Sequence, residues 1–309
     1  MFYFIVNPHS RSGKALNIWN ELEQTLKNNN IEYTSFFTDY IGHAIKIAED
    51  ITCRASSDNH IKLVILGGDG TVNEAYNGIR NHKYVTIGYI PTGSGNDFAR
   101  GLKLPTKPPA ALKNILNSTK TIQLESGIMS TGDISRRFAV SCGIGYDASI
   151  THRVMTSKLK KVLNKIGLGK LVYAFFGVIN VFKKPQTSAE IYIDGELALQ
   201  QKKFYFASIH ILKYEGGGFP FAPHANPSDS LLAVTVFHST TRLGFALNLI
   251  ASMFTKHVGR KGVTTFQCKA CTVKTSKGNY MHTDGEGWGL VSELTTSICS
   301  DDEFINIII

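Results

Sequence analysis

The sequence lacks the features that would place the chain across or outside a membrane. No apolar run reaches the ~20 residues that a membrane-spanning helix needs. The longest runs are LVYAFFGVINVF (171–182) and FALNLIASMF (245–254). The N-terminal MFYFIVNPHS has no basic segment and no small-residue cleavage site, so we expect no secretory signal. These absences predict a cytoplasmic protein.

Cysteine is also scarce. Five cysteines, an odd number, are typical of a protein from a reducing compartment. Cys268 and Cys271 have CxxC spacing, but no second pair accompanies them. Both fall in a predicted strand, which would direct the two thiols to opposite faces. We interpret them as structural residues.

Acidic residues are fewer than basic ones, with 24 Asp and Glu against 33 Lys and Arg. The resulting net charge of +9 favours polyanionic partners: nucleotide phosphates, an anionic membrane or nucleic acid. No recognised nucleic-acid-binding module is present, so we expect no nucleic acid partner. A length of 309 residues with 43% hydrophobic content is enough for two domains, each with its own core.

Residues 1–128 alternate predicted strands with predicted helices. Strands are expected at 2–6, 32–37, 61–66 and 85–90, and helices near 14–29, 42–55, 72–80 and 96–101. This alternation predicts an α/β domain with a mostly parallel sheet and ligand loops at the carboxyl ends of the strands.

After residue 128 the pattern becomes rich in strands. The strand-like stretches are RFAVSCGIG, SAEIYID, KFYFASIHI, LLAVTVF and ACTVKTS, often alternating and bounded by turns. They predict an antiparallel β-sandwich or barrel over residues 129–309, interrupted by a basic helical insert at 152–184. The last strand, FINIII, belongs either to this domain or to the N-terminal sheet.

Three glycines and a carboxylate stand where the predicted strand 61–66 meets a helix, in Gly67-Gly68-Asp69-Gly70-Thr71. Glycine lets the backbone approach a ligand, and a helix start offers unpaired N–H groups, so the junction suits phosphate. Asp69 fits there if Mg²⁺ bridges its carboxylate to phosphate oxygens. Thr71 is suited to cap the helix. The alternative is a glycine-rich turn with a surface aspartate.

Two other predicted strands also end in small polar loops, NPHSRSGK (7–14) and PTGSGNDFAR (91–100). The first is not a Walker A loop, because it lacks the earlier glycine and a Ser or Thr after Lys14. Three such loops on one sheet edge favour a phosphate site over a set of unrelated turns.

These motifs resemble the diacylglycerol kinase catalytic-domain family of lipid kinases, especially its soluble bacterial members. The resemblance covers nearly the whole chain. The motifs on which the resemblance rests are NPHSRSGKA (7–15), GGDGTVNE (67–74), PTGSGNDFAR (91–100), GIGYDA (143–148), GGGFPFAPHANPSD (216–229) and DGE (284–286). It implies a nucleotide-binding kinase domain like that of NAD kinase and phosphofructokinase over 1–128, followed by a β-rich lipid-substrate domain over 129–309.

The resemblance implies that ATP is the phosphate donor and lies along the three loops, with Thr38 near the adenine. The implied nucleotide-binding residues are Asn7, Ser10, Gly13, Lys14, Thr38, Gly67, Gly68, Asp69, Gly70, Thr71, Asn73, Glu74, Ser94 and Asn96. Asp69 and Asp97 would organise catalytic Mg²⁺.

Glu286 matches the family's general base and Asp284 its neighbour. A positioned carboxylate can accept the proton of an alcohol while the phosphoryl group transfers, which supports this role. Taken alone, Asp284-Gly285 predicts only a hairpin turn, and the resemblance decides between the two interpretations.

A second, structural Mg²⁺ is implied for the loop before LLAVTVF, where Asp229 would supply its carboxylate and Asn226 and Leu231 their carbonyls. The loop departs from the family's usual residues at three positions, His224, Ser230 and Ala233. The alternative is a loop aspartate that caps a turn, and the sequence leaves both open.

The insert at 152–184 sets four lysines (158, 160, 161 and 165) beside apolar residues. Such a stretch can lie on anionic lipid. It is also the pattern of an ordinary helix with a solvated lysine face. We expect a peripheral protein at the inner face of the membrane.

The sequence thus predicts an ATP- and Mg²⁺-dependent kinase of diacylglycerol or a related lipid. Two alternatives stay open: a nucleotide kinase like NAD kinase, and a catalytically silent protein that binds lipid or nucleotide. Homodimer formation is also left open.

Overall fold

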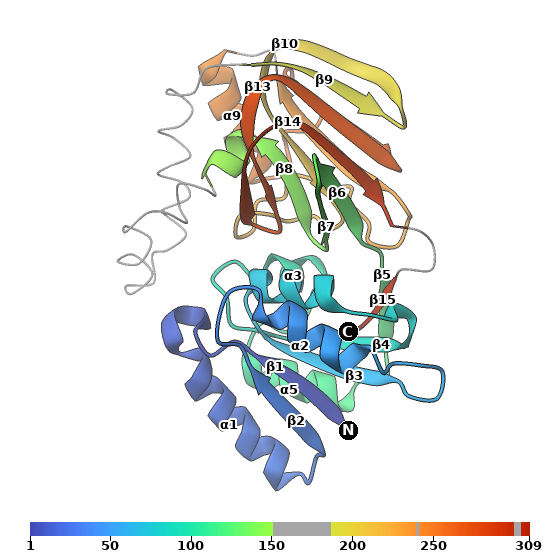
Figure 1. Cartoon of the computed structure of the whole chain (residues 1–309). Coiled ribbons are helices and arrows are strands. Elements are labelled where there is room, and N and C mark those ends of the chain that lie inside the picture. Colours follow the sequence, from blue (N-terminus) through green and yellow to red (C-terminus); the bar gives the residue numbers. More distant parts are fainter. Residues whose placement is uncertain (151–186, 239–240, 300–303) are drawn as a thin grey trace. The chain divides into compact units, whose positions relative to one another are not determined.

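The computed structural model describes residues 1–150, 187–238, 241–299 and 304–309. The chain forms two compact units, one of Met1–Glu125 with Cys299–Ile309 and one of Ser126–Ile298 (Figure 1). The predicted basic insert at 152–184 lies outside the described residues. Within them, no helix combines the length and the apolar character needed to cross a membrane.

Unit 1 alternates strands and helices as the sequence predicts. Its elements are β1 (Phe2–Val6), a 3₁₀ turn η1 (Ser10–Gly13), α1 (Ala15–Asn28), β2 (Tyr33–Phe37), α2 (His43–Thr52), β3 (Ile61–Gly67), α3 (Asp69–Gly78), η2 (His82–Tyr84), β4 (Val85–Pro91), α4 (Asp97–Gly101), α5 (Pro108–Asn117), β5 (Thr121–Leu124) and β15 (Ile305–Ile308). The strand order is β2-β1-β3-β4-β15-β5. All pairs are parallel except β15 with β5. The prediction of a mostly parallel sheet is confirmed.

Both faces of this sheet are buried. On one face, Phe4 and Val6 of β1 join a core that includes Trp19 of α1 and Leu112 of α5. The alternate residues of β1 and β3, such as Ile5, are buried as well. This explains why the strands read as continuous apolar runs rather than alternating ones.

Helix α3 begins earlier than the sequence predicts. Asp69 is its first residue and Gly68 its N-cap, so the prediction that Thr71 caps the helix is wrong. Thr71 lies in the first turn, where its Oγ1 accepts a hydrogen bond from the side chain of Asn7 instead. A carboxylate at the first helical position interacts favourably with the helix dipole, which supports the earlier start.

The C-terminal strand β15 returns to unit 1, the destination that the sequence left open. Ile307 pairs with Ile87 of β4 on one side and with Ile122 of β5 on the other. Strand β5 has no other partner in the described sheet. The link between β4 and β5 therefore depends on a segment from the far end of the chain.

In its described residues, unit 2 consists mainly of antiparallel strands. Its elements are β6 (Gly127–Thr131), β7 (Ile134–Phe138), β8 (Ser141–Gly145), β9 (Thr187–Ile193), β10 (Glu196–His210), β11 (Leu232–His238), α9 (Arg242–Ser252), β12 (Val263–Cys268), β13 (Ala270–Thr283) and β14 (Glu286–Ile298). The strand order is β12-β11-β10-β8-β13-β14-β6-β7, and β9 pairs with both β10 and β13. The antiparallel C-terminal β domain is thereby confirmed.

Strands β10 and β13 are two long strands that connect others in this unit. Each pairs with β8 near one end and with β9 near the other, so the strands form a branched network (Figure 1). An aromatic cluster beside them includes Phe206 of β10, Phe237 of β11 and Phe245 of α9. The rings of Phe206 and Phe237 stack with centroids 4.5 Å apart. Helix α9 is thus anchored to the strands by one buried face.

The CxxC pair does not lie in one strand, which corrects the sequence interpretation of opposite faces. Cys268 ends β12 and Cys271 lies in β13, and both side chains are buried. The chain bends between them because Asp194 Oδ1 accepts hydrogen bonds from the backbone N–H groups of Lys269 and Ala270. Burial raises the pKa of the Cys268 thiol to about 12, which fits a structural role.

Replacing Ile307 with Ala tests the importance of β15. The side chain is fully buried, so we expect unit 1 to lose about 2–5 kcal/mol of unfolding free energy. The chain has two tryptophans, so in a Trp288→Phe background the fluorescence of Trp19 reports unit 1 alone during urea unfolding. Ile309→Ala is the control, because Ile309 is 36% exposed. If Ile307→Ala and Ile309→Ala unfold at the same urea concentration, β15 does not stabilise unit 1.

Candidate active site

The three glycine-containing loops begin at one edge of the unit 1 sheet. Strands β1, β3 and β4 are adjacent and parallel, and their carboxyl ends are Val6, Gly67 and Pro91. The register aligns Val6 with Leu66, and Gly67 with Pro91. Parallel neighbours end at the same edge of a sheet, and in open α/β sheets ligands bind there.

Hydrogen bonds join these loops to one another. Asn7 Nδ2 donates to Thr71 Oγ1 at 2.9 Å, linking the first loop to α3. The hydroxyls of Ser10 and Thr92 are 2.6 Å apart, linking the first loop to the third. The backbone N–H of Thr92 donates to the carbonyl of Gly67 at 2.8 Å. The three loops therefore form one connected surface.

Two glycines allow the second and third loops to approach. A Cβ added to Gly93 would lie 2.9 Å from the Cα of Gly68, closer than real Cβ contacts allow. Any side chain at Gly93 would push the loops apart, so glycine is needed there for packing as well as for ligand access.

The carboxylates of Asp69 and Asp97 occupy the first positions of two helices, α3 and α4. Asp69 Oδ1 accepts a hydrogen bond from the backbone N–H of Phe98 at 3.2 Å, and the Asp97 carboxylate pairs with the Arg100 side chain. Burial, and then the negative charges of Asp69 and Asp97, raise the pKa of the Tyr89 hydroxyl well above its ordinary value. Two carboxylates thus gather where the second and third loops meet.

These residues also fit a hard divalent cation. Asn96 precedes Asp97, and its Oδ1 is buried and makes no hydrogen bond within the described part of the chain. An amide oxygen and two carboxylates are the ligand types that Mg²⁺ prefers in proteins. Asp69, Asn96 and Asp97 are therefore the residues of unit 1 that could hold such an ion.

The opening loop has an unusual backbone. Arg11, Ser12 and Gly13 all have left-handed φ values, of 52°, 57° and 86°, and Lys14 follows as the residue before α1. Consecutive left-handed residues are rare outside glycine, because the Cβ crowds the backbone. This conformation carries the exposed Lys14 to the helix start.

Other residues of the predicted nucleotide set have packing roles in unit 1. Glu74 is nearly buried, and its carboxylate accepts a hydrogen bond from the backbone N–H of Ala44 in the first turn of α2. Asn73 and Thr38 are buried, whereas Ser94 is exposed in the third loop. Direct contacts of these residues with a nucleotide stay predictions.

In unit 2, Asp284 and Gly285 form a two-residue hairpin between β13 and β14, as their sequence favours. Both have positive φ, 47° and 83°, which is typical of a type I′ turn. The Asp284 carboxylate accepts backbone hydrogen bonds from Ala139, Val140 and Ser141, at 3.0, 2.9 and 2.9 Å. Asp284 therefore ties the hairpin to the start of β8.

Glu286 is the first residue of β14, paired with Thr283 and half-buried. Thr283 also accepts a hydrogen bond from Trp288 Nε1 at 2.8 Å. The carboxylate of Glu286 thus projects from a hairpin whose geometry the three bonds to Asp284 hold in place. Its role as a base stays a prediction.

The residues implied for the second Mg²⁺ lie in a separate loop of unit 2. Asp229 Oδ1 accepts a hydrogen bond from the backbone N–H of Leu231 at 3.1 Å, and Asn226 Oδ1 accepts one from Ser228 at 3.3 Å. These are the contacts of side chains that cap turns. They match the alternative interpretation of this loop, and the metal site stays a prediction.

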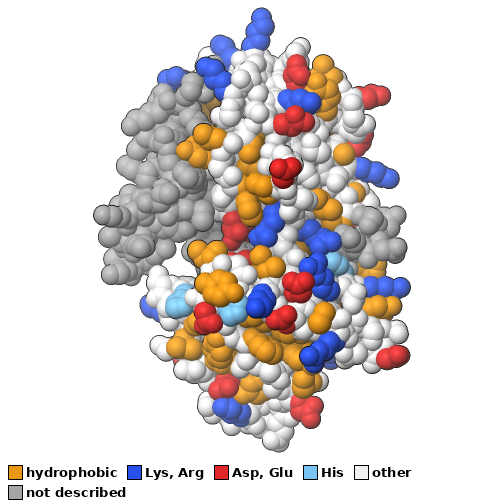
Figure 2. All heavy atoms as spheres, viewed as in Figure 1, with side chains coloured by type: hydrophobic (Ala, Val, Ile, Leu, Met, Phe, Trp, Pro, Cys, Tyr) orange, Lys and Arg blue, Asp and Glu red, His pale blue; other side chains and the backbone are white. Residues whose placement is uncertain are grey.

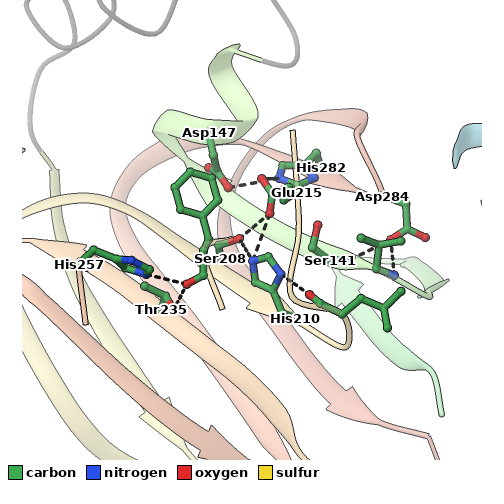
Figure 3. Close-up of polar contacts among 12 residues, drawn as sticks. Ser141, Asp147, Ser208, His210, Glu215, Thr235, His257, His282 and Asp284 are labelled. Carbon is green, nitrogen blue, oxygen red and sulfur yellow. Dashed lines mark hydrogen bonds and ion pairs between the residues drawn. The ribbon is translucent and has the colours of Figure 1, made fainter. Parts of the chain in front are cut away.

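A buried polar cluster in unit 2 was not predicted from the sequence. Asp147, Glu215 and His282 converge there, as Figure 3 shows. Burial alone would lower the pKa of His282, but the charge of Glu215 and hydrogen bonds to both carboxylates raise it to about 10. No local spacing connects positions 147, 215 and 282. The available signals were separate ones: Asp147 lies in GIGYDA, Glu215 directly precedes GGGFPF, and His282 lies beside DGE in MHTDGE.

Two family profiles match the chain. The diacylglycerol kinase catalytic domain matches residues 1–126, and the YegS C-terminal NAD kinase beta sandwich-like domain matches residues 140–299. These two ranges correspond closely to unit 1 without its last strand and to unit 2.

Individual proteins are similar over nearly the whole length. "Putative lipid kinase YtlR" of Bacillus subtilis is 29% identical over 300 residues, which is 93% of this chain and 94% of that protein. A diacylglycerol kinase of the same bacterium is 26% identical over 257 residues, covering 81% and 80%.

A solved structure has the same fold. A crystal structure described as "a putative diacylglycerol kinase" from Bacillus anthracis aligns with a TM-score of 0.77 at 20% identity, over 99% of this chain and 96% of that one. Two matched profiles, long relatives and a shared fold agree with one another. The chain therefore belongs to the diacylglycerol kinase catalytic-domain family of lipid kinases, with a C-terminal domain of the YegS type.

Proposed function

We propose that this protein is an ATP- and Mg²⁺-dependent lipid kinase that transfers the γ-phosphate to a hydroxyl of diacylglycerol or a related lipid. The observation that carries the proposal is the joining of three small-residue loops at one sheet edge, with the carboxylates of Asp69 and Asp97 among them. Family membership implies ATP as the phosphate donor.

Unit 1 would bind the nucleotide through its backbone and its loop side chains. The N-terminus of α3 offers unpaired N–H groups to phosphate oxygens, and Lys14 adds a positive charge. Glycines at 68 and 93 let the second and third loops approach one another, so that both backbones could line one phosphate site. Mg²⁺ held by Asp69 and Asp97 would neutralise phosphate charge during the transfer.

Unit 2 would supply the base. Glu286 would accept the proton of the lipid hydroxyl as the hydroxyl oxygen attacks the γ-phosphorus. Asp284 would act as a positioning residue, because its carboxylate is already engaged by three backbone N–H groups. In this proposal the nucleotide-binding and proton-accepting residues come from different units of the chain.

The two alternative functions explain less of the sequence. A nucleotide kinase like NAD kinase shares the β-sandwich type, but the profile that matches unit 1 is that of diacylglycerol kinases. A catalytically silent binding protein would have no need to retain Asp69, Asp97 and Glu286. A lipid-panel phosphorylation assay with labelled ATP, read by chromatography, separates all three functions.

A peripheral membrane location also has support within the described residues. Leu243, Leu247 and Ile250 of α9 are between 48% and 67% exposed, as are Met253 and Phe254 just after it. Three of these lie at i, i+4 and i+7, on one face of the helix. An exposed apolar face of this size is the feature by which a helix rests in a membrane interface.

The segment of the sequence that contains α9 is basic, which suits an anionic membrane. Acidic and basic side chains are mixed on the face drawn in Figure 2, so the net charge of +9 is not spread as a uniform positive cover. The sequence between Asp229 and Asp284, however, has seven Lys or Arg residues and no acidic residue. This segment contains α9. We therefore propose that α9 contacts the anionic inner face of the membrane.

Asp69→Asn should abolish phosphoryl transfer without unfolding the protein. The amide keeps an oxygen for the Phe98 N–H but loses the charge that would hold Mg²⁺. A bound metal contributes several kcal/mol, so kcat should fall about 100-fold or more. Asp58→Asn, at an exposed carboxylate of the same unit, is the control. Near-normal turnover in a folded Asp69→Asn protein would contradict the assignment.

Glu286→Gln should lower kcat by a factor of about 10² to 10⁴, because the amide cannot accept the substrate proton. The KM for ATP should change little, since the nucleotide is assigned to unit 1. Steady-state kinetics on a detergent-solubilised lipid measures both parameters. Glu293→Gln, at an exposed position of the same strand, controls for the charge change. A normal kcat with a raised KM for ATP would place Glu286 in nucleotide binding.

Replacing Leu243, Leu247 and Ile250 together with Gln should reduce sedimentation with phosphatidylglycerol vesicles by about tenfold or more, because the apolar contact with lipid is lost. Activity on detergent-solubilised lipid should be nearly unchanged. The matched control is Ile134→Gln with Leu197→Gln, two exposed apolar residues on strands. If both proteins bind vesicles like the wild type, α9 is not the contact surface.

A further inference from the structure

The buried cluster of unit 2 brings together three side chains from separate parts of the fold. Asp147 follows β8 directly, Glu215 lies in the loop after β10, and His282 is near the end of β13. All three are almost completely buried. Figure 3 shows their polar ends pointing toward one another. The proposed phosphoryl transfer uses none of them.

The donor atoms have the spacing of metal ligands. His282 Nε2 lies 3.2 Å from Asp147 Oδ2 and 3.2 Å from Glu215 Oε1. One ligand atom from each residue fits within a 4.8 Å span, the one such group of three among the described residues. Two ligands bound about 2.1 Å from one ion are themselves roughly 3.0–3.5 Å apart. The observed separations fall in that range.

A second observation points to a missing partner at this place. Oδ1 of Asp147 is buried and makes no hydrogen bond in the part of the chain that the structure describes. Leaving a buried carboxylate oxygen unpaired is costly, so such an atom calls for an explanation. A cation bound by this carboxylate would provide one.

The surroundings hold one of the three donors, the Glu215 carboxylate, in place. Ser208 Oγ donates to Glu215 Oε2 at 2.6 Å, which leaves Oε1 directed toward His282. His210 Nε2 lies 2.7 Å from the same hydroxyl, and its Nδ1 donates to the Leu212 carbonyl at 2.9 Å. Hydrogen bonds to the outer atoms of ligating side chains are characteristic of metal sites, where they fix ligand orientation.

Glycine keeps space open beside the donors. A Cβ on Gly143 would lie 2.1 Å from Asp147 Oδ2 and 2.6 Å from His282 Nε2. Gly143 pairs with both His282 of β13 and Ser208 of β10, so it sits at the centre of the strand network. Any other residue there would displace two of the three donor atoms.

We propose that Asp147, Glu215 and His282 form a site for one divalent transition-metal ion, such as Zn²⁺ or Mn²⁺. Two carboxylates balance the charge of the ion. His282 supplies the third ligand through Nε2, after losing to solvent the proton that it now shares with both carboxylates. Imidazole suits first-row transition metals, whereas Mg²⁺ and Ca²⁺ prefer oxygen ligands alone. The site is therefore chemically distinct from the Mg²⁺ sites of the proposed kinase reaction, and its existence does not depend on that reaction.

Such an ion would join three parts of unit 2. It would tie the segment after β8 and the loop after β10 to the end of β13, where His282 stands two residues before Asp284. The hairpin that carries Glu286 would then be held by the ion on one strand and by the Asp284 hydrogen bonds at the turn. The role of the ion would be structural.

The test measures metal directly, on untagged full-length protein stripped with chelator. Every protein carries Cys53→Ser, because Cys53 is the exposed thiol. Isothermal titration with ZnCl₂ and with MnCl₂, in excess MgCl₂ that fills the proposed Mg²⁺ sites, should give about one site per chain. Mass spectrometry should find one equivalent of Zn²⁺ or Mn²⁺ after dialysis against MgCl₂. MgCl₂ titrated at the same concentrations should not compete.

Variants locate the ion. His282→Gln and Asp147→Asn should each weaken Mn²⁺ binding at least about 100-fold, and Ser208→Ala should weaken it about 10- to 100-fold as an outer-shell change. Asp133→Asn, an exposed carboxylate in the same unit, should bind like the wild type. If a variant at a buried residue fails to fold, the amount of metal bound by the wild-type protein still tests the proposal. Substoichiometric binding by folded wild-type protein, or equal binding by a folded His282→Gln variant, would overturn the proposal.

Discussion

The parallel pairing of β1, β3 and β4 is the constraint on which the three loops of unit 1 depend. Its register brings Val6, Gly67 and Pro91 to one edge, so that three loops far apart in sequence can share hydrogen bonds. No single loop binds phosphate by a complete motif of its own. The opening loop lacks the Walker A pattern, and the proposed phosphate site would exist only once the sheet has formed.

In unit 2, aspartate carboxylates perform the corresponding organising work. Asp284 accepts three backbone N–H groups, and Asp194 accepts two at the bend between β12 and β13. Each carboxylate satisfies donors that would otherwise be unpaired where a strand begins or turns. A residue that looks catalytic from its motif, such as Asp284, can therefore be essential because it fixes the backbone. Glu286, two residues later, depends on that backbone for its direction.

Much of the fold and of the unit 1 loops could be predicted because the evidence is local. Apolar runs ending in glycine mark β3 and β4, and short motifs mark the loops that follow them. Thr71 was misassigned because a helix can start at either of two nearby residues, and the side chain of Thr71 bonds instead to Asn7 from the loop after β1. Cys268 and Cys271 were misassigned because the bend between them is made by Asp194, far away in sequence. Asp147, Glu215 and His282 could not be grouped at all, since only the pairing of β8, β10 and β13 brings them together.

The position of β15 has a consequence for how the protein is made. Among the described strands, β5 pairs with β15 alone, and all of unit 2 is synthesised between these two strands. During synthesis on the ribosome, the sheet of unit 1 therefore stays incomplete while unit 2 is made. In that interval β5 is unpaired and the edge of β4 is exposed. An unpaired strand edge invites association with other chains. The nascent protein is thus most exposed to aggregation, and to chaperone binding, in the interval before residues 305–308 leave the exit tunnel.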